Sequence, residues 1–175
     1  MILHYFMKKE NKDKKNANRI YISLINLIKE IFDNKDLMIK RDFNSSFELS
    51  AILLSTLFFI FKNKFNNKHI NQYLMDLFIA DLDLSLRELG ISNMSIGKYV
   101  KSYVKKLYYR MFKIEKIIEN KNFEEFEKYI ENINIHYNLN SISNLSKLLF
   151  LTINNLLKIP KSEQLSEFTL LNLSN

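Results

Sequence analysis

The residue types best suited to chemistry gather in the stretch ADLDLSLRELGISNMSIGKYVK, residues 80–101. Its carboxylates, Asp81, Asp83 and Glu88, interrupt a leucine-rich run, and the only two glycines of the chain follow before the lysines begin. A carboxylate that leaves water loses its hydration, so acids on a partly apolar surface need a cation beside them. The stretch therefore predicts ion pairing.

A helix over residues 71–89 accounts for the spacing of these acids. The segment ADLDLSL alternates as a half-buried strand does, but the apolar residues of the whole region form one continuous arc at the helical step of about 100° per residue. On this helix Asp76, Asp83 and Arg87 share one stripe, which we expect to be solvated or self-paired. Asp81 falls on a second stripe among leucines.

Glu88 shares that second stripe, and the following helix offers two cations to meet it. Arg110 lies at the edge of the apolar face of that helix, and Lys98 lies near the turn. A helical hairpin across this turn would bring the two helices together. We predict that Arg110 or Lys98 pairs with Asp81 or Glu88, either as an internal network that fixes the hairpin or as part of a contact with a partner protein.

Lysines of the same helix form a basic stripe: Lys98, Lys105, Lys113 and Lys116. A solvated helix face, a site for ribosomal RNA and a site for anionic lipid all fit this stripe, because phosphates attract lysines without any sequence readout. The net charge of +7 also favours an anionic partner, although it does not choose among them. We expect the tyrosines of this helix to lie in the core and at its rim: Tyr99, Tyr103, Tyr108 and Tyr109.

Several kinds of chemistry find no support in the sequence. Cysteine is absent, which excludes disulfides, thiolate metal sites and cysteine nucleophiles. His4, His69 and His136 have unrelated spacings, so we expect no metal site. No serine, histidine and acid arrangement or glycine-rich phosphate loop is visible. We therefore expect no enzyme, no cofactor and no small-molecule substrate.

The elements that must position these residues are helices almost throughout. Two glycines and one proline leave few helix breakers. The patterns predict an all-α fold, one compact domain with a central antiparallel helical hairpin and helices over residues 17–32, 45–62, 71–89, 95–119, 122–133 and 141–160. The predicted end signals are Ser45 with Glu48, Gly90, Ser95, Asn122, Ser141 and Pro160. Residues 1–16 are predicted to be a flexible basic lead-in, 17–160 the domain and 161–175 a tail.

The most apolar segment is Leu49–Phe61, 13 residues long. A helix needs about 20 such residues to span a bilayer, so we expect a buried core helix. If the segment were exposed instead, the chain could be a peripheral membrane protein. The N-terminus places apolar residues before basic ones, the reverse of a signal peptide, and we expect a cytoplasmic location.

The stretch from Phe78 to Arg110 resembles the ubiquinol–cytochrome c chaperone family of mitochondria and alphaproteobacteria. That family has a Phe-x-x-Asp-x-Asp-x-x-Leu-Arg-Glu-x-Gly run, a Lys-x-x-Lys pair and a Tyr-x-Arg ending. The matching residues are Phe78, Asp81, Asp83, Leu86, Arg87, Glu88, Gly90, Gly97, Lys98, Lys101, Tyr108 and Arg110. FELSAILLSTLFFI stands for the Gly-Arg-Phe-Glu helix start of the family, with Ser45 and Ser46 in place of Gly-Arg. Leu53 replaces a common histidine, which weakens any expectation of haem ligation there.

The resemblance implies an all-helical, non-enzymatic assembly factor. Its client would be newly made cytochrome b, and it would promote assembly of ubiquinol–cytochrome c reductase. A bacterial member would act on the cytoplasmic face of the inner membrane. A small co-chaperone, the ribosome and an anionic membrane surface stay open as further partners, whereas DNA is not expected. The alternatives are a small basic RNA- or ribosome-binding protein and a peripheral membrane-binding protein.

Overall fold

The computed structural model of the chain describes residues 2–159, with side chains described for 12–138 and 141–159. This part of the chain is helical, without a strand, apart from an isolated antiparallel bridge between Ile39 and His136. The prediction of an all-α domain is confirmed. Six α-helices and one short 3₁₀ helix (Lys35–Leu37) make up the fold: α1 (Ile2–Asp33), α2 (Phe43–Asn63), α3 (Lys68–Glu88), α4 (Asn93–Asn120), α5 (Phe123–Ile133) and α6 (Leu139–Lys158).

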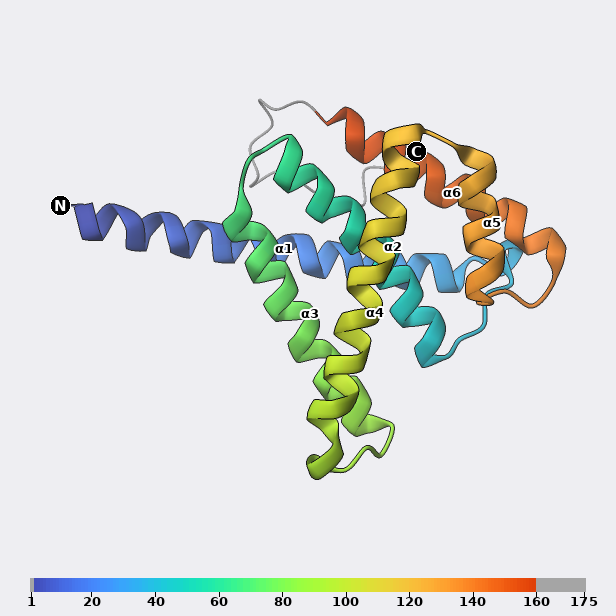
Figure 1. Cartoon of the computed structure of the whole chain (residues 1–175), viewed down its shortest axis with the longest axis horizontal. Coiled ribbons are helices and arrows are strands. Elements are labelled where there is room, and N and C mark those ends of the chain that lie inside the picture. The colour runs from blue at the N-terminus through green and yellow to red at the C-terminus, as the bar shows by residue number, and fades with distance from the viewer. Residues whose placement is uncertain (1, 160–175) are drawn as a thin grey trace.

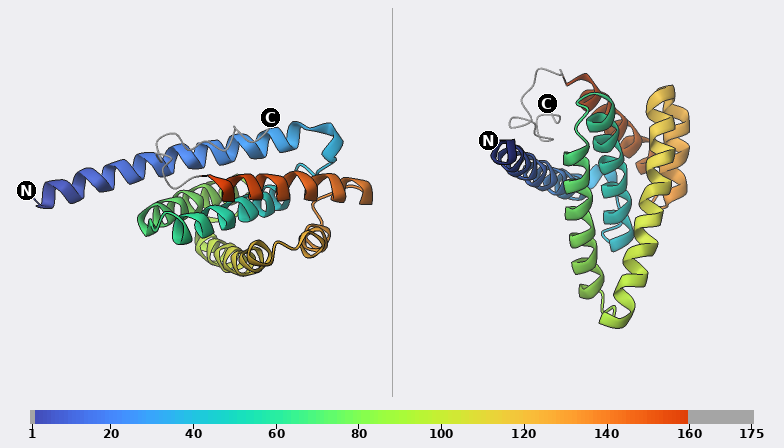
Figure 2. Two further views of the ribbon diagram at one scale, coloured as in Figure 1. Left: turned by 90° about the horizontal axis from the view of Figure 1, so that it is seen from above. Right: turned by 60° about the vertical axis from the view of Figure 1, so that its left-hand side comes forward.

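The helices form three layers, which the view from above shows most clearly (Figure 2). α2, α3 and α6 form the middle layer, α1 crosses one side of it, and α4 and α5 cover the other side. α3 and α4 are the two arms of a V whose turn projects from the rest of the molecule (Figure 1). This V is the predicted antiparallel hairpin, and α2 packs against both of its arms.

α2 is the central core helix. By length and apolar composition it could cross a membrane, but 78% of its apolar window is buried inside the fold. Fully buried members include Leu49, Leu53, Leu57 and Phe61. The predicted burial of this segment is confirmed, and most of α2 packs against its neighbouring helices.

Three of the predicted N-caps lie three residues C-terminal to the N-caps that the structure shows. The side chain of Asp42 caps α2 by accepting a hydrogen bond from the backbone N–H of Ser45 at 2.8 Å. Asn138 caps α6 in the same way, with Ser141 as donor at 2.9 Å. The carboxylate or amide oxygen is placed one turn before the serine, so the serine supplies its N–H instead of its hydroxyl.

The third of these N-caps belongs to α4. Its N-cap is Ser92 and not Ser95, and the Ser92 side chain makes no capping hydrogen bond. α3 begins after Asn67, three residues before its predicted start, because the Asn67 side chain accepts from the N–H of Ile70. The prediction for α5 is confirmed, since Asn122 accepts from the N–H of Glu125 at 3.1 Å.

Gly90 ends the α3 arm of the hairpin as predicted. Its φ of +86° lies in the left-handed region that only glycine adopts freely. Its N–H donates to the carbonyl of Arg87 at 2.9 Å, and the N–H of Ile91 donates to the carbonyl of Leu86 at 3.1 Å. These two bonds close the last turn of α3 and set the direction of the chain toward α4.

The first helix begins at Ile2 and not near residue 17. Lysine and glutamate are good helix formers, and no breaker interrupts the lead-in, so the helix continues through it. Asp13 and Asn16 are already buried, and Asp13 accepts a hydrogen bond from the Asn67 amide at 3.4 Å. Whether residues 1–16 are flexible stays a prediction. α6 ends at Lys158, and both Pro160 and the predicted tail 161–175 lie outside the described residues.

Candidate functional site

The candidate site is the V of α3 and α4, because it carries the acids, arginines and lysines singled out in the sequence. Its two arms meet at the turn and diverge away from it, while α2 fills the space between them (Figure 1). Near the turn, α3 and α4 therefore face each other. Farther from the turn, each of them also packs against another helix, α3 against α1 and α4 against α2. This divergence decides which charges meet.

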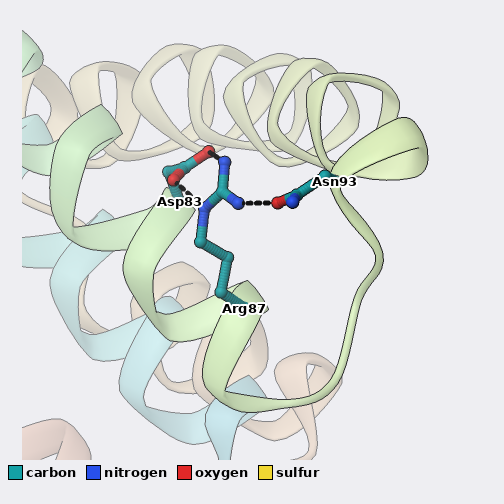
Figure 3. A network of polar contacts seen from close by, with 3 residues as sticks. All are labelled: Asp83, Arg87 and Asn93. Atoms are coloured by element: carbon teal, nitrogen blue, oxygen red, sulfur yellow. Dashed lines mark hydrogen bonds and ion pairs between the residues drawn. The ribbon is translucent and has the colours of Figure 1, made fainter.

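Near the turn, Arg87 joins the two arms (Figure 3). Its guanidinium donates to Asp83 from Nε to Oδ2 at 2.6 Å and from Nη2 to Oδ1 at 3.3 Å, and Nη1 donates to Oδ1 of Asn93, the first residue of α4. The prediction that the stripe of Asp76, Asp83 and Arg87 is solvated or self-paired is confirmed for Asp83 and Arg87, which pair with each other. The hydrogen bond with Asp83 raises the pKa of Arg87. The pair is largely open to solvent, so its role is to orient the turn.

Arg110 pairs with Glu48 of α2, not with Asp81 or Glu88. Nε donates to Oε2 at 2.8 Å and Nη2 donates to Oε1 at 2.7 Å, which is a bidentate arrangement. The side chains are 18% and 2% exposed. Because Arg110 lies several turns beyond the vertex of the V, its arm has already left α3, and the helix that it faces there is α2.

The surroundings of Arg110 reinforce this ion pair. Burial lowers the pKa of the Arg110 guanidinium. The hydrogen bonds to the Glu48 carboxylate, together with the electrostatic effect of Tyr129, Glu48 and Tyr109, raise this pKa above its ordinary value overall. The guanidinium carbon also lies 5.8 Å from the ring centres of both Tyr109 and Tyr129. Burial raises the pKa of Tyr129, and its hydroxyl has no hydrogen-bond partner within the described part of the chain. Arg110 is thus permanently charged, and its guanidinium is fixed by Glu48 and by the two tyrosine rings.

Asp81 has a different partner from the one predicted. It is exposed on the side of α3 that faces α1, where it accepts a hydrogen bond from the hydroxyl of Tyr21 at 2.9 Å. Tyr21 is buried, and this burial, together with the charge of Asp81, raises its pKa. The stripe of Asp81 therefore faces α1 and not α4. The predicted Asp81–Arg110 pair is wrong for this reason.

The remaining charged residues of the motif lie on the surface. Glu88, Lys98 and Lys101 are exposed, and none of the ion pairs found among the described residues includes them. The prediction that Lys98 meets Asp81 or Glu88 is therefore wrong as well. These three side chains lie near the turn, where a binding partner could reach them.

Phe78 has a structural position. It is buried and lies 6.2 Å, between ring centres, from Phe47, which in turn lies 4.9 Å from Tyr103. This aromatic cluster joins α3, α2 and α4, and its α2 member, Phe47, directly precedes Glu48.

A groove runs between α3 and α4 with α2 as its floor. It has a volume of about 240 Å³, and its wall is mostly apolar and aromatic: Phe58, Phe59, Met75, Tyr108 and Met111. Lys62 and Glu115, which form a 3.2 Å ion pair, also line the groove, as do Lys68 and Gln72. The amide oxygen of Asn71 is buried in this wall without a partner in the described residues. We name this feature the α2–α4 groove, because α2, α3 and α4 together line it.

The outward side of α4 carries the predicted lysine stripe, and all four of its lysines are exposed. Tyr103 is half-buried as expected, but Tyr108 and Tyr109 are more than half exposed, and so is Phe112. Tyr99 is exposed as well, so the expectation that the tyrosines lie in the core and at its rim is wrong for these three. No group of His, Asp and Glu able to hold a metal ion occurs among the described residues.

The sequence predicted Glu48 as part of a helix start with Ser45 and not as the partner of Arg110, and it did not single out Tyr21. Glu48 does carry a signal, since it is the single charge within the apolar run from Phe47 to Phe61. A charge in a core helix must have a cation opposite it, and Arg110, at the edge of an apolar face, has the complementary signal. Tyr21 has no such signal, because a tyrosine on an apolar stripe is ordinary core.

These features define an all-α domain with an open apolar groove, the kind of surface to which helical segments of other proteins bind. The model of the ubiquinol-cytochrome C chaperone family matches residues 35–136, which include α2 to α5. The chain therefore belongs to the ubiquinol-cytochrome C chaperone family. Both Glu48 and Arg110 lie inside the matched region, and so does the whole V.

A solved structure shares the fold. The crystal structure of the Cbp3 homolog from Brucella abortus is similar with a TM-score of 0.71 and 17% sequence identity, over 95% of this chain and 99% of that one. A search of curated proteins found no match. The similarity therefore extends beyond the matched region to nearly the whole chain, α1 and α6 included.

Proposed function

We propose that the protein is an assembly chaperone that binds newly made cytochrome b and promotes assembly of ubiquinol–cytochrome c reductase. The observation that carries this proposal is the family match over residues 35–136, because these residues build the V, the buried ion pair and the α2–α4 groove. The assembly role follows from the family. The identity of the client is inferred from the family resemblance, and the groove supports only that the client has an apolar segment.

The α2–α4 groove suits an apolar helical segment. Its aromatic and methionine side chains offer an adaptable apolar wall, and methionine is well suited to surfaces that accept more than one shape. Its volume of about 240 Å³ admits a few large side chains but not a whole helix. A client helix would therefore lie along the groove and insert one or two apolar side chains between Met75 and Tyr108.

A capture experiment tests this proposal. Tagged protein should co-purify newly made cytochrome b, and Met75→Asp combined with Tyr108→Ala should reduce the captured amount at least fivefold. Tyr137→Ala is a matched control, because Tyr137 is 67% exposed but lies outside the groove. Equal capture by the groove variant and the control would contradict the groove as the client site. Capture of other membrane proteins in place of cytochrome b would contradict the named client.

Deletion of the protein tests the assembly role directly. We expect less assembled ubiquinol–cytochrome c reductase and less b-type haem absorbance, while other oxidases stay near normal. Unchanged reductase would leave this function without support. We also propose that the protein acts on the cytoplasmic face of the inner membrane, where a newly made membrane client would be met. Cell fractionation should then find it both free and loosely bound to the membrane, with the bound part released by high salt.

A further inference from the structure

The outward side of α4 combines cations with exposed aromatic residues. Its lysines are Lys98, Lys101, Lys105, Lys113 and Lys116, all exposed. Between and beside them lie Tyr109 and Phe112, and Tyr108, which also lines the α2–α4 groove; all three are 55–56% exposed. α4 carries no acidic residue before Glu115. We name this surface the α4 outer face.

The α4 outer face continues into an apolar tip at the vertex of the V. Met94, in the first turn of α4, is 99% exposed, and Leu89, at the end of α3, is 58% exposed. Both side chains are more than half exposed, and Met94 is almost completely so. The tip projects from the body of the molecule (Figure 1), so both side chains can reach a surface that the rest of the protein does not touch.

From this arrangement we infer that the α4 outer face and its tip form a binding surface for an anionic lipid bilayer. A single straight helix presents its lysines along one line, and from Lys98 to Lys116 this line is about 27 Å long, at 1.5 Å per residue. A flat row of cations matches a flat anionic surface. Tyrosines favour the interface between water and acyl chains, and the apolar tip gains free energy by entering the acyl region.

The ring geometry favours lipid over RNA. Proteins that bind single-stranded RNA stack bases on free aromatic faces. Here the ammonium group of Lys116 lies 4.3 Å above the ring of Phe112, and Lys113 lies 5.7 Å from the ring centre of Tyr109. Arg110 lies near the Tyr109 ring as well. These cations occupy ring faces on which bases would stack, whereas they leave the ring edges and the lysine charges available to headgroups.

Vesicle co-sedimentation of the full chain tests the inference. We expect binding to vesicles of phosphatidylcholine and phosphatidylglycerol at a 70:30 ratio, and little binding to pure phosphatidylcholine. One lysine near an anionic leaflet contributes about fivefold in partitioning, so loss of three lysines alone lowers binding by on the order of 100-fold. The triple variant Lys98→Glu, Lys105→Glu and Lys116→Glu should lose at least this much, because each glutamate is also repelled. The matched control is Lys14→Glu, Lys29→Glu and Lys147→Glu, which changes the net charge equally at exposed lysines outside α4.

The control variant shows whether vesicle binding depends on the lysines of the α4 outer face or only on the net charge of the protein. Retained binding by the control supports the α4 outer face, whereas equal loss in both triple variants overturns it. Failure of the parent protein to bind anionic vesicles while it shifts a 20-nucleotide single-stranded RNA in a gel would also overturn it. This inference does not depend on the identity of the client, so its failure would leave the capture and deletion experiments untouched.

A second measurement does not need charge reversal. Because the chain has no cysteine, Met94→Cys can be labelled at one position with an environment-sensitive fluorophore. Addition of the anionic vesicles should shift its emission to shorter wavelength, as expected when the tip enters the acyl region. Leu151→Cys is the matched control, at 55% exposure on α6. An equal shift at both positions, or none at Met94→Cys, would overturn the insertion of the tip.

Discussion

The guanidinium of Arg110 and the carboxylate of Glu48 meet through two hydrogen bonds of 2.8 and 2.7 Å, and Glu48 is almost completely buried. This pair is the strongest polar link between α2 and α4 that the described residues show. The two residues belong to separate parts of the chain that resemble the family, the Phe-Glu helix start and the Tyr-x-Arg ending. Each part of the motif therefore supplies one half of a single interaction.

Removal of Arg110 should destabilise the protein strongly. Arg110→Ala leaves the Glu48 carboxylate buried without a cation, and we expect a loss of about 3 to 5 kcal/mol in the free energy of unfolding. Lys62→Ala removes one partner of an exposed pair and should cost less than about 1 kcal/mol. Denaturant unfolding followed by circular dichroism measures both. If Arg110→Ala were as stable as the parent yet lost the client, the pair would belong to the binding surface instead of the fold.

Replacing both partners should recover much of this loss. In the double variant Glu48→Leu and Arg110→Met no charge stays buried, and apolar side chains of similar size fill the space. We expect the double variant to be more stable than either single variant, with a coupling free energy of about 1 to 3 kcal/mol. Strictly additive losses in the same unfolding experiment would show that the two side chains do not act as a pair.

The buried tyrosines should make the protein sensitive to alkaline pH. The pKa values of Tyr21 and Tyr129 are raised in the folded state, so the folded protein holds these protons more tightly than the unfolded chain, whose tyrosines titrate near pH 10. This stabilisation is complete below about pH 10 and is lost as the pH rises further. Tyr21→Phe and Tyr129→Phe should each flatten the fall in stability above pH 10, whereas the exposed Tyr137→Phe should not.

His136 should contribute an acid-side dependence of the opposite sign. Burial, and then the charge of Lys40, lower its pKa in the folded state. The unfolded chain therefore takes up this proton first, so the contribution of His136 is complete above about pH 6.5 and is lost as the pH falls through the folded-state pKa. His136→Gln should reduce the slope of stability against pH in that window. An unchanged slope would show that this histidine is not the group responsible.

The exposed lysines should behave unlike Arg110. Lys98→Ala, Lys105→Ala and Lys116→Ala remove solvated charges and should leave the melting temperature within about 2 °C of the parent, because surface charges contribute little to stability. Their effect should appear only in partner or vesicle binding. A large fall in melting temperature would place these lysines among the residues that hold the fold.

Helical periodicity was sufficient to predict the fold class, the number of long helices and the hairpin, because the apolar arcs of α2, α3 and α4 face the core as their spacing requires. The helix starts were less predictable, since Asp42 and Asn138 are better N-caps than the serines three residues later. The partner of Arg110 was not predictable from α3 and α4 alone. It depends on the angle at which the two arms diverge, and no local sequence pattern carries that angle.

The bridge between Ile39 and His136 has a consequence for folding kinetics. The backbone of Lys40 also bonds to Ile135, and its ammonium bonds to Asn134, 94 positions along the chain. Closing so long a loop is entropically unfavourable until the helices between its ends have packed. We expect these contacts between residues 39–40 and 134–136 to form after the folding transition state. Kinetic φ-values, the fraction of a stability change that appears in the folding rate, should then be near zero at Ile39 and higher at positions such as Leu53 on α2. We therefore expect the two ends of the matched region, residues 35–136, to come together late in folding.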